Sequence, residues 1–206
     1  MNIKTNTPQS FSGRAQIIKD ADKICRDINS AFPHFSPSYS WFNFGKPRQF
    51  NDAFIRYDDK LNMIRSSRDN TDTAYDYYNK LMHLVKKYKC ANCEELAEIA
   101  YLACKNKKLQ DVKLIGVYGY NNRKHKLVDY DHMAVSFRDG KKTVIVDPWF
   151  GIADFAQNCL VKYKQTYHEF FCRFNPDFKM TFKAEPAVRI GKSDLADLMK
   201  RYSEFL

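Results

Sequence analysis

The sequence has little of what marks fibrous, disordered or membrane-spanning proteins. Its 206 residues include only 7 glycines and 7 prolines, too few for a collagen or a low-complexity chain. No run of about 18 apolar residues is present, which predicts that no helix spans a membrane. The start of the chain contains no apolar segment of the kind that an ordinary signal peptide needs. We therefore expect the protein to act in a reducing compartment, by default the cytoplasm.

The chain also lacks a disulfide framework, because its six cysteines are irregularly spaced in a sequence too long for that class. A chain of this length buries about 70% of the surface that its unfolded form exposes, so it needs neither disulfides nor a metal to fold. Aromatic residues make up 15% of the sequence, far more than in disordered proteins. We expect one compact monomer, with a helical and irregular lobe over residues 1–70 and a core over residues 71–206.

Positive charge is the main bias of the composition. The 34 Lys and Arg residues outnumber the 24 Asp and Glu residues and give a net charge of +10. Between Lys80 and Lys126, 11 basic residues stand against 4 acidic ones. Such a surface either simply keeps the protein soluble or attracts an acidic partner. Because no zinc-finger, RNA-recognition or recognition-helix motif is present, we expect no nucleic acid. An acidic protein face is the expected partner, and peripheral membrane contact stays open.

Apolar residues at helical spacing predict most of the first half of the chain. They cover residues 17–31, where a proline then ends the helix. A capping box opens a second helix at Thr73, which runs to Lys89. Residues 33–52 are rich in proline and aromatics and indicate an ordered but irregular segment. A last helix follows Ser193 near the end of the chain.

The period of the apolar pattern changes to two in the second half. Three segments predict strands, namely 112–120, 131–138 and 142–147. The Asp139-Gly140 pair between the last two is a strong hairpin signal. Because helices come first and strands follow, the expected fold class is α+β with an antiparallel sheet.

Cys93 is predicted to lie at the start of a third helix. Asn92 is a favoured N-cap residue, and Glu95 follows at the position of a capping-box acid. Cys93 then meets the positive end of the helix dipole, a setting that lowers a thiol pKa and favours the nucleophilic thiolate. The backbone N–H groups of the same turn could bind an oxyanion. The alternative is a buried cysteine that only packs.

The hairpin predicts a partner for His132. With Asp139 and Gly140 as the turn, opposed positions sum to 279 and His132 lies directly across from Asp147. Directly opposed Cβ atoms are about 4.5–5.5 Å apart, within reach of an imidazole and a carboxylate. The two residues share the less apolar face of the hairpin, at its open end. The alternative is a surface ion pair of small stabilising value.

Cys93, His132 and Asp147 together suggest nucleophilic catalysis, in which Cys attacks a carbonyl, His moves the proton and Asp orients the imidazole. The sequence resembles the papain-like and transglutaminase-like cysteine enzymes at three short motifs in this order, NCEELA (92–97), DHMAVSF (131–137) and VIVDPWFG (144–151). The resemblance covers less than a third of the chain. It is strongest to the bacterial toxin and effector branch, which includes the catalytic domain of the Pasteurella multocida toxin and the YopT-type cysteine proteases.

This resemblance implies a fold in which the cysteine-bearing helix packs on an antiparallel sheet that carries His132 and Asp147. It implies a thiol enzyme that needs no cofactor or metal, with Cys93 as the nucleophile, His132 as general base and acid, and Asp147 as the orienting acid. The implied activity is glutamine deamidation of a host protein by an effector that a dedicated bacterial secretion system delivers into the host cytoplasm. A cysteine protease of the same superfamily and a non-catalytic basic binding module are the alternatives.

Cys90 and Cys93 form a C-x-x-C pair that supports two other readings. One is a zinc site with Cys104 or His125 as further ligands, although structural zinc usually shows two paired motifs. The other is redox control, in which Cys90 forms a disulfide with Cys93 on oxidation. A thioredoxin-like enzyme would need a strand before the motif, whereas a helix ends at Lys89.

The remaining candidates have ordinary explanations. Trp149 either folds over the His–Asp pair and limits water or only fills the edge of the core. Three other cysteines lie in mixed apolar and aromatic contexts and are expected in the core, namely Cys25, Cys159 and Cys172. Four histidines have no acidic partner at a defined spacing and are expected to be structural or surface residues, namely His34, His83, His125 and His168.

Overall fold

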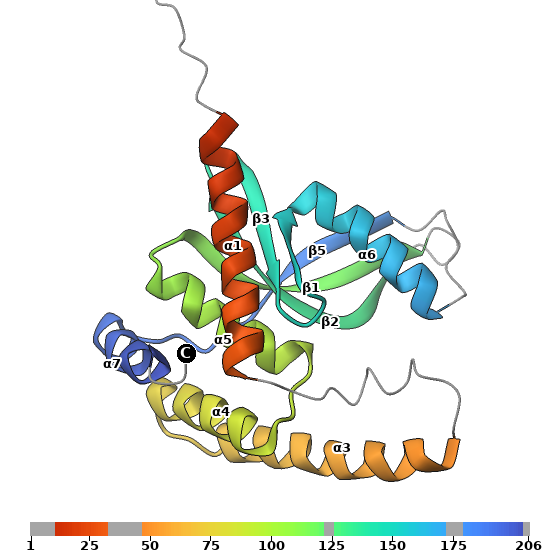
Figure 1. The fold of residues 1–206 in the computed structure, drawn as a ribbon, viewed down its shortest axis with the longest axis vertical. Helices are drawn as coiled ribbons and strands as arrows, with labels where there is room; N and C mark the ends of the chain where they lie inside the picture. The colour runs from red at the N-terminus through yellow and green to blue at the C-terminus, as the bar shows by residue number, and fades with distance from the viewer. Residues whose placement is uncertain (1–10, 33–46, 122–125, 172–178, 204–206) are drawn as a thin grey trace, which may run out of the picture.

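The computed structural model describes residues 11–32, 47–121, 126–171 and 179–203. In this part of the chain, six helices accompany a five-stranded antiparallel sheet (Figure 1). The α+β class and the antiparallel sheet are therefore confirmed. The elements in order are α1 (Phe11–Ala31), α3 (Pro47–Asp69), α4 (Ala74–Tyr88), α5 (Cys93–Asn106), β1 (Gln110–Asn121), β2 (Lys126–Asp139), β3 (Lys142–Asp147), β4 (Ile152–Phe155), α6 (Ala156–Phe171), β5 (Lys179–Glu185) and α7 (Lys192–Ser203). Helices α3 and α4 lie beyond α5, to one side of the sheet (Figure 1).

The strands lie in the order β4-β3-β2-β1-β5. Each strand from β1 to β3 pairs with its successor, while β5 returns to the far side of β1. The two longest strands, β1 and β2, therefore form the centre of the sheet. This places the β2–β3 hairpin, which was predicted to carry the candidate site, beside the middle of the sheet and not at its edge.

The register of the β2–β3 hairpin differs from the prediction by two residues. Asp139 pairs with Lys142, so the turn consists of Gly140 and Lys141 and opposed positions sum to 281. The prediction took Asp139 as the first turn residue. Gly140 has a φ of +57°, and a glycine in the first turn position is equally compatible with a tight hairpin. The Asp-Gly pair alone did not distinguish these two registers.

A slip of two residues keeps every side chain on its predicted face, whereas a slip of one would reverse the faces. His132 and Asp147 therefore still share a face, but they are diagonal neighbours and not directly opposed. The direct opposition that we predicted for them is wrong, and the shared face is right.

Both faces of the sheet are covered by helices. One face joins α1, α4 and α5 in a large buried cluster, to which the strands contribute Val112, Leu114, Val135, Phe137, Val144, Val146 and Ala153. The alternate strand residues point the other way and form a second cluster with Cys159 and Tyr163 of α6, namely Ile115, Val117, Ala134, Ile145 and Ile152. The less apolar face of the hairpin is thus also buried, because α6 covers it.

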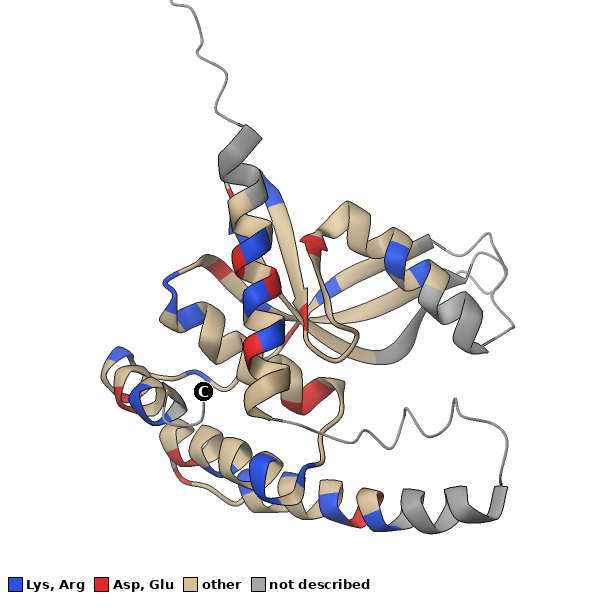
Figure 2. Ribbon diagram, in the orientation of Figure 1, with Lys and Arg blue, Asp and Glu red and all other residues tan. Residues whose placement is uncertain are grey.

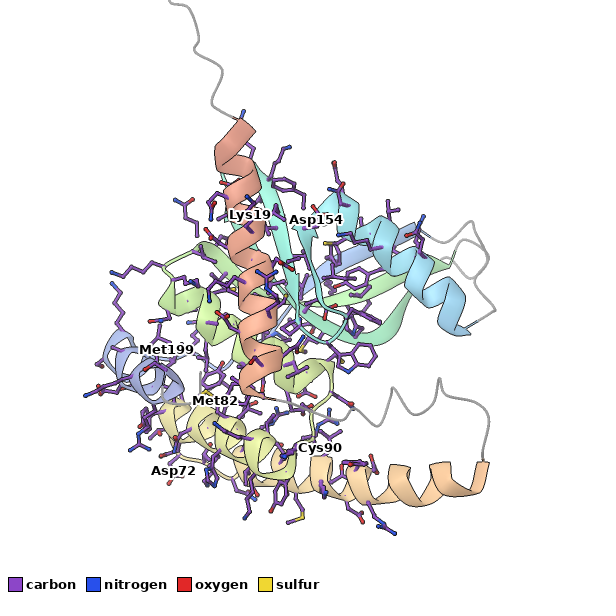
Figure 3. The ribbon with its side chains drawn as sticks, viewed as in Figure 1. Lys19, Asp72, Met82, Cys90, Asp154 and Met199 are labelled. Carbon is purple, nitrogen blue, oxygen red and sulfur yellow. The ribbon has the colours of Figure 1, made fainter. Side chains whose placement is uncertain are left out.

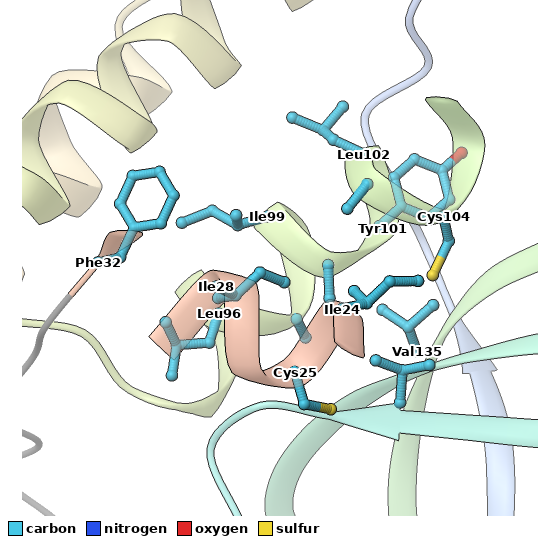
Figure 4. Packing of buried hydrophobic residues seen from close by; sticks show 14 of the residues in the cluster. Ile24, Cys25, Ile28, Phe32, Leu96, Ile99, Tyr101, Leu102, Cys104 and Val135 are labelled. Atoms are coloured by element: carbon cyan, nitrogen blue, oxygen red, sulfur yellow. The ribbon is translucent and has the colours of Figure 1, made fainter. Parts of the chain in front are cut away.

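Helices α1 and α5 fill the space on the first face. Ile24 and Ile28 of α1 lie in the same buried cluster as Leu96 and Ile99 of α5, and Val135 of β2 packs against its side (Figure 4). The exposed side of α1 carries alternating charges (Figure 2), with ion pairs of Lys23 to Asp27 and of Arg26 to Asp22. The opposite sides of α1 thus face core and water, as its apolar spacing predicted.

Several elements were not predicted. Residues 47–52, expected to be irregular, begin helix α3, whose first residue is a proline, a favoured choice at a helix start. The rest of the predicted irregular segment, 33–46, lies outside the described residues. Strands β4 and β5 and helix α6 were not assigned from the sequence either. No helix in the described ranges is both long and apolar enough to cross a membrane.

Candidate active site

Cys93 is the first residue of α5, as predicted. Asn92 is the N-cap, and its backbone N–H donates a hydrogen bond to the Oε2 atom of Glu95 at 3.0 Å. Glu95 is completely buried, and its Oε1 atom accepts a hydrogen bond from Arg65 of α3 at 2.9 Å. The capping residue is therefore itself held by a neighbouring helix. Cys93 is partly exposed at this fixed helix start.

His132 lies where the ladder between β1 and β2 is interrupted. Gly116 pairs with Met133, but Tyr118 pairs with Asp129, so residues 130–132 of β2 stand opposite a single residue of β1. Bulges of this kind are common beside active sites, since they redirect side chains. On the other side of His132, β3 has already ended at Asp147. The imidazole thus lies at an open end of the hairpin, where it can meet groups from outside the sheet.

Asp147 receives three hydrogen bonds. Its Oδ2 atom accepts from Nε2 of His132 at 2.6 Å and from the hydroxyl of Tyr163 at 2.6 Å. Its Oδ1 atom accepts from the backbone N–H of Phe150 at 3.1 Å. Asp147 is completely buried and His132 is 5% exposed. A surface ion pair, the alternative considered for these residues, is therefore excluded.

The environment of His132 favours the charged imidazolium. Burial alone lowers the pKa of His132, but the charge of Asp147, their hydrogen bond and the interactions with Cys93 outweigh burial and raise the pKa well above its usual range. Since Nε2 binds Asp147, the ring nitrogen left to face Cys93 is Nδ1. The structure thus brings all three predicted residues together, from α5, β2 and β3.

Aromatic rings enclose the imidazole. The ring centroids of Trp149, Phe150 and Tyr163 lie 5.3, 4.7 and 5.6 Å from that of His132. Trp149 is also part of the large buried cluster. The two roles considered for Trp149 are therefore not exclusive, because the ring packs beside the His–Asp pair and closes the edge of the core.

The turn that carries Trp149 and Phe150 is held in place from two directions. The backbone N–H of Gly151 donates to the carbonyl of Pro148 at 3.2 Å, and Gly151 has a φ of +64°, which favours glycine. The side chain of Asn29 on α1 donates to the same carbonyl at 3.0 Å. Helix α1 thereby fixes the segment directly after Asp147.

The other described cysteines are buried and do not belong to this arrangement. Burial raises the pKa of Cys90, Cys104 and Cys159 to about 11, 12 and 12, and raises that of Cys25 as well. The Cys90 thiol, in the link between α4 and α5 (Figure 3), donates to the carbonyl of Tyr57 at 3.4 Å. The core positions expected for Cys25 and Cys159 are confirmed, while Cys172 lies outside the described residues.

Neither alternative for the C-x-x-C pair finds support in the described part of the chain. There, no group of three His, Cys, Asp or Glu side chains is placed to hold a metal ion, and no disulfide joins the five cysteines. His125, one of the ligands considered for zinc, is not among the described residues.

Sequence reasoning missed Tyr163, Phe150 and Asn29. Tyr163 follows Asp147 by 16 residues and comes from a helix that was not predicted. Asn29 is 119 residues away from its partner, Pro148. The one local signal was the short distance in sequence from Asp147 to Phe150, since an Asp side chain often accepts from a backbone N–H a few residues on.

No protein-family model matches the chain, and no curated protein does either. Among solved structures, the chain is similar to calcium-bound LapG of Legionella pneumophila. The TM-score is 0.29 and the identity 13%, over 90% of this chain and 98% of that one. A similarity of this size carries no weight for fold or function, so the interpretation of the site rests on its own contacts.

Proposed function

We propose that the protein is a cysteine-dependent amide hydrolase or acyl transferase, with Cys93 as nucleophile, His132 as general base and acid, and Asp147 as the residue that orients the imidazole. One observation carries the proposal: the imidazole is held at 2.6 Å by a buried carboxylate while its ring also interacts with Cys93. A helix that starts with the cysteine and packs on an antiparallel sheet with the other two residues supports a papain-like or transglutaminase-like core.

The first half of the reaction forms a thioester. The imidazolium of His132 favours the thiolate of Cys93, and this sulfur attacks the carbonyl carbon of an amide. The C–S bond forms as the carbonyl electrons move to oxygen, where N–H groups of the first turn of α5 can stabilise the negative charge. When the tetrahedral intermediate collapses, the C–N bond breaks and the proton of His132 passes to the leaving nitrogen.

The second half releases the acyl group. The neutral imidazole takes a proton from water, the resulting hydroxide attacks the thioester carbon, and the thiolate leaves. Asp147 stabilises the imidazolium each time it forms. For a glutamine side chain, the products are glutamate and ammonia. If an amine replaces water, the same thioester yields a crosslink.

Glutamine deamidation of a host protein is the finer form of the proposal. It is supported by the resemblance of the three motifs to the bacterial toxin and effector branch, which also suggests delivery by a dedicated secretion system. An acidic face on the host protein fits the net charge of +10. A cysteine protease of the same chemistry is the alternative, since only the shape of the substrate and the attacking group differ.

Alkylation followed by mass spectrometry tests the thiol enzyme. The wild-type chain is treated with limiting iodoacetamide near neutral pH under reductant, and each cysteine-containing peptide is quantified. We expect Cys93 to react far faster than the four buried cysteines that the structure describes. Cys90→Ser serves as the matched control and should label like the wild type. Equal labelling of several cysteines, or retained activity of Cys93→Ala, would contradict the assignment.

The same chain, incubated with a eukaryotic cytosolic extract, then distinguishes the reactions. A gain of about one dalton on a glutamine, the exchange of NH2 for OH, supports deamidation. A peptide cut supports the protease, and a crosslink supports acyl transfer. Each signal must vanish with Cys93→Ser. Selective labelling of Cys93 without any modified protein would favour the binding module over the enzyme.

A further inference from the structure

Tyr163 shares an oxygen of Asp147 with His132. Its hydroxyl donates to Oδ2 at 2.6 Å, the same atom that accepts from Nε2 of His132 at 2.6 Å. Both Tyr163 and Asp147 are completely buried. Two strong donors on a single carboxylate oxygen compete for its electron density, so each weakens the hold of Asp147 on the other.

The second oxygen of Asp147 is held separately. Oδ1 accepts from the backbone N–H of Phe150, within the turn that Asn29 of α1 fixes through Pro148. The carboxylate therefore keeps its orientation through the backbone, even without the tyrosine hydroxyl. What Tyr163 adds is a control on how strongly Asp147 pulls on the imidazole proton.

The geometry points to Tyr163 as a positioning residue of the site, a fourth member that acts through Asp147 and moderates the basicity of His132. This inference rests on the proposed function, because a general acid must release its proton to the leaving nitrogen in every cycle. An imidazolium held by an unshared, buried carboxylate would release that proton too reluctantly. Helix α6 thus belongs to the site, although it carries none of the three predicted residues.

The titratable groups around the pair come from every element packed against it. Cys93 faces the imidazole from α5, and Tyr163 faces the pair from α6. The thiols of Cys25 on α1 and Cys159 on α6 also lie near Asp147, but burial raises the pKa of each. These two thiols therefore stay neutral, and a change in the titration of His132 reports on Asp147, Cys93 and Tyr163.

The test follows the protonation of His132 directly. In the 206-residue chain, the ring resonances of His132 are assigned by comparison with His132→Ala and titrated by NMR. In Tyr163→Phe, the midpoint should move upward by roughly half a pH unit or more, since Oδ2 loses its competing donor. The matched control is Tyr78→Phe, which removes another buried hydroxyl, one that donates to the carbonyl of Val188 at 2.9 Å. The control should leave the midpoint in place.

Two further variants make the test independent of simple loss of packing. Site-specific replacement of Tyr163 by 3-fluorotyrosine strengthens the donor and should move the midpoint downward. In an Asp147→Asn background, Tyr163→Phe should have no further effect, because the tyrosine acts only through the carboxylate. A midpoint that stays in place or moves down in Tyr163→Phe, or a shift that persists in the Asp147→Asn background, overturns the inference.

These outcomes separate the inference from the proposed function. The titration needs neither a substrate nor a reactive Cys93. If alkylation shows that Cys93 is inert while the midpoint still moves, the enzyme proposal fails, and only the effect of Tyr163 on the basicity of His132 stands. If Cys93 is selectively reactive and the midpoint does not move, only the role of Tyr163 fails.

Discussion

At the scale of single residues, the described cysteines differ in what surrounds them. Cys25, Cys90, Cys104 and Cys159 are fully or almost fully buried, whereas Cys93 is partly exposed beside a histidine. Burial disfavours a thiolate, and a neighbouring imidazolium favours it. Among the five described thiols, which would be equivalent in an unfolded protein, Cys93 is therefore the one that we propose as the nucleophile.

His132 is predicted to account for most of the reactivity of Cys93 at low pH. A thiol without such help has a pKa of about 8.5 and is less than about 1% ionised at pH 6. His132→Ala should therefore lower the rate constant of alkylation by iodoacetamide at pH 6 by about 100-fold. Asp147→Asn should cost less, because its amide oxygen can still accept from the imidazole but no longer carries the charge that favours imidazolium. Asp147→Ala should fall between the two.

The rate constants are compared with those at pH 9, where thiols ionise unaided and the variants should converge. The double variant His132→Ala/Asp147→Ala should react about as slowly as His132→Ala alone, because Asp147 acts through the histidine. Additive losses would show that the two residues affect Cys93 independently and would break the triad.

At the scale of secondary-structure elements, the start of α5 is held by charges from α3. Arg68 binds Glu98 at 2.7 Å and also contacts Glu94, while Arg65 binds Glu95. The hydroxyl of Tyr77 on α4 donates to Glu98 at 2.7 Å. These contacts join α3, α4 and the first turns of α5, the helix that begins with the candidate nucleophile Cys93.

Removing Glu95 should loosen this end of the helix. Glu95→Ala leaves the N–H of Asn92 and the guanidinium of Arg65 without their buried partner, which costs about 3 kcal/mol of unfolding free energy. Urea denaturation measures the loss, and Asp197→Ala, an exposed acid on α7, should change stability by less than about 0.5 kcal/mol. If Glu95→Ala lowers the free energy of unfolding no more than the control does, the cap does not stabilise the fold.

Glu98 should make stability depend on pH. Burial raises the pKa of Glu98 to about 7, although Arg68 and Tyr77 act in the opposite direction and Glu94 and Glu95 add to the increase. Between about pH 4.3, the usual glutamate value, and pH 7, the folded chain keeps a proton that the unfolded chain has lost. The contribution of Glu98 to stability is therefore full below this range and is lost as the pH rises through it.

Glu98→Gln removes this titration. The stability of the variant relative to the wild type should rise between pH 5 and pH 7, with a slope of up to about 1.4 kcal/mol per pH unit. Urea denaturation at several pH values measures the slope. In the control Asp111→Asn, the replaced carboxyl has a pKa lowered by Lys113, so its curve should run parallel to that of the wild type in this range. Parallel curves for Glu98→Gln would refute the prediction.

The sequence predicted those features of the site that depend on residues close together in the chain. It did not predict contacts between residues that are far apart in the chain. Asn92 and Glu95 lie within one turn, so the start of α5 could be predicted. His132 and Asp147 were placed on one face by the period of two alone, even though the turn was misassigned by one residue and the register therefore by two. Tyr163 of α6 contacts Asp147, and Asn29 of α1 contacts Pro148, only because the helices pack there in the folded chain. The spacing of residues within each helix does not predict these contacts.

At the scale of the whole molecule, basic side chains gather at the end of α5 that is far from Cys93. Lys107 and Lys108 are exposed there, next to Lys105, and Figure 2 shows basic residues around this turn. A helix of 14 residues is about 20 Å long, roughly twice the Debye length at physiological salt. This charge can guide a large partner but barely affects the field at the cysteine.

Reversing the three charges should therefore separate docking from chemistry. With Lys105, Lys107 and Lys108 all changed to Glu, modification of an acidic protein substrate should slow several-fold, and more strongly at low salt. The ratio of the alkylation rates of Cys93 by iodoacetate and by iodoacetamide reports the local charge and should not change. An equal loss in the protein assay and in both alkylation rates would indicate misfolding instead.

Helix α1 is synthesised before the strands that it covers. Its Cys25 donates to the carbonyl of Ile152, 127 residues further along the chain. At 5–20 residues per second, translation needs roughly ten seconds to produce that partner. During this time the apolar side of α1, with Ile24 and Ile28, has no sheet to cover. A nascent chain should therefore leave this side of α1 uncovered until β4 has been made, and during that time the side offers chaperones a binding site.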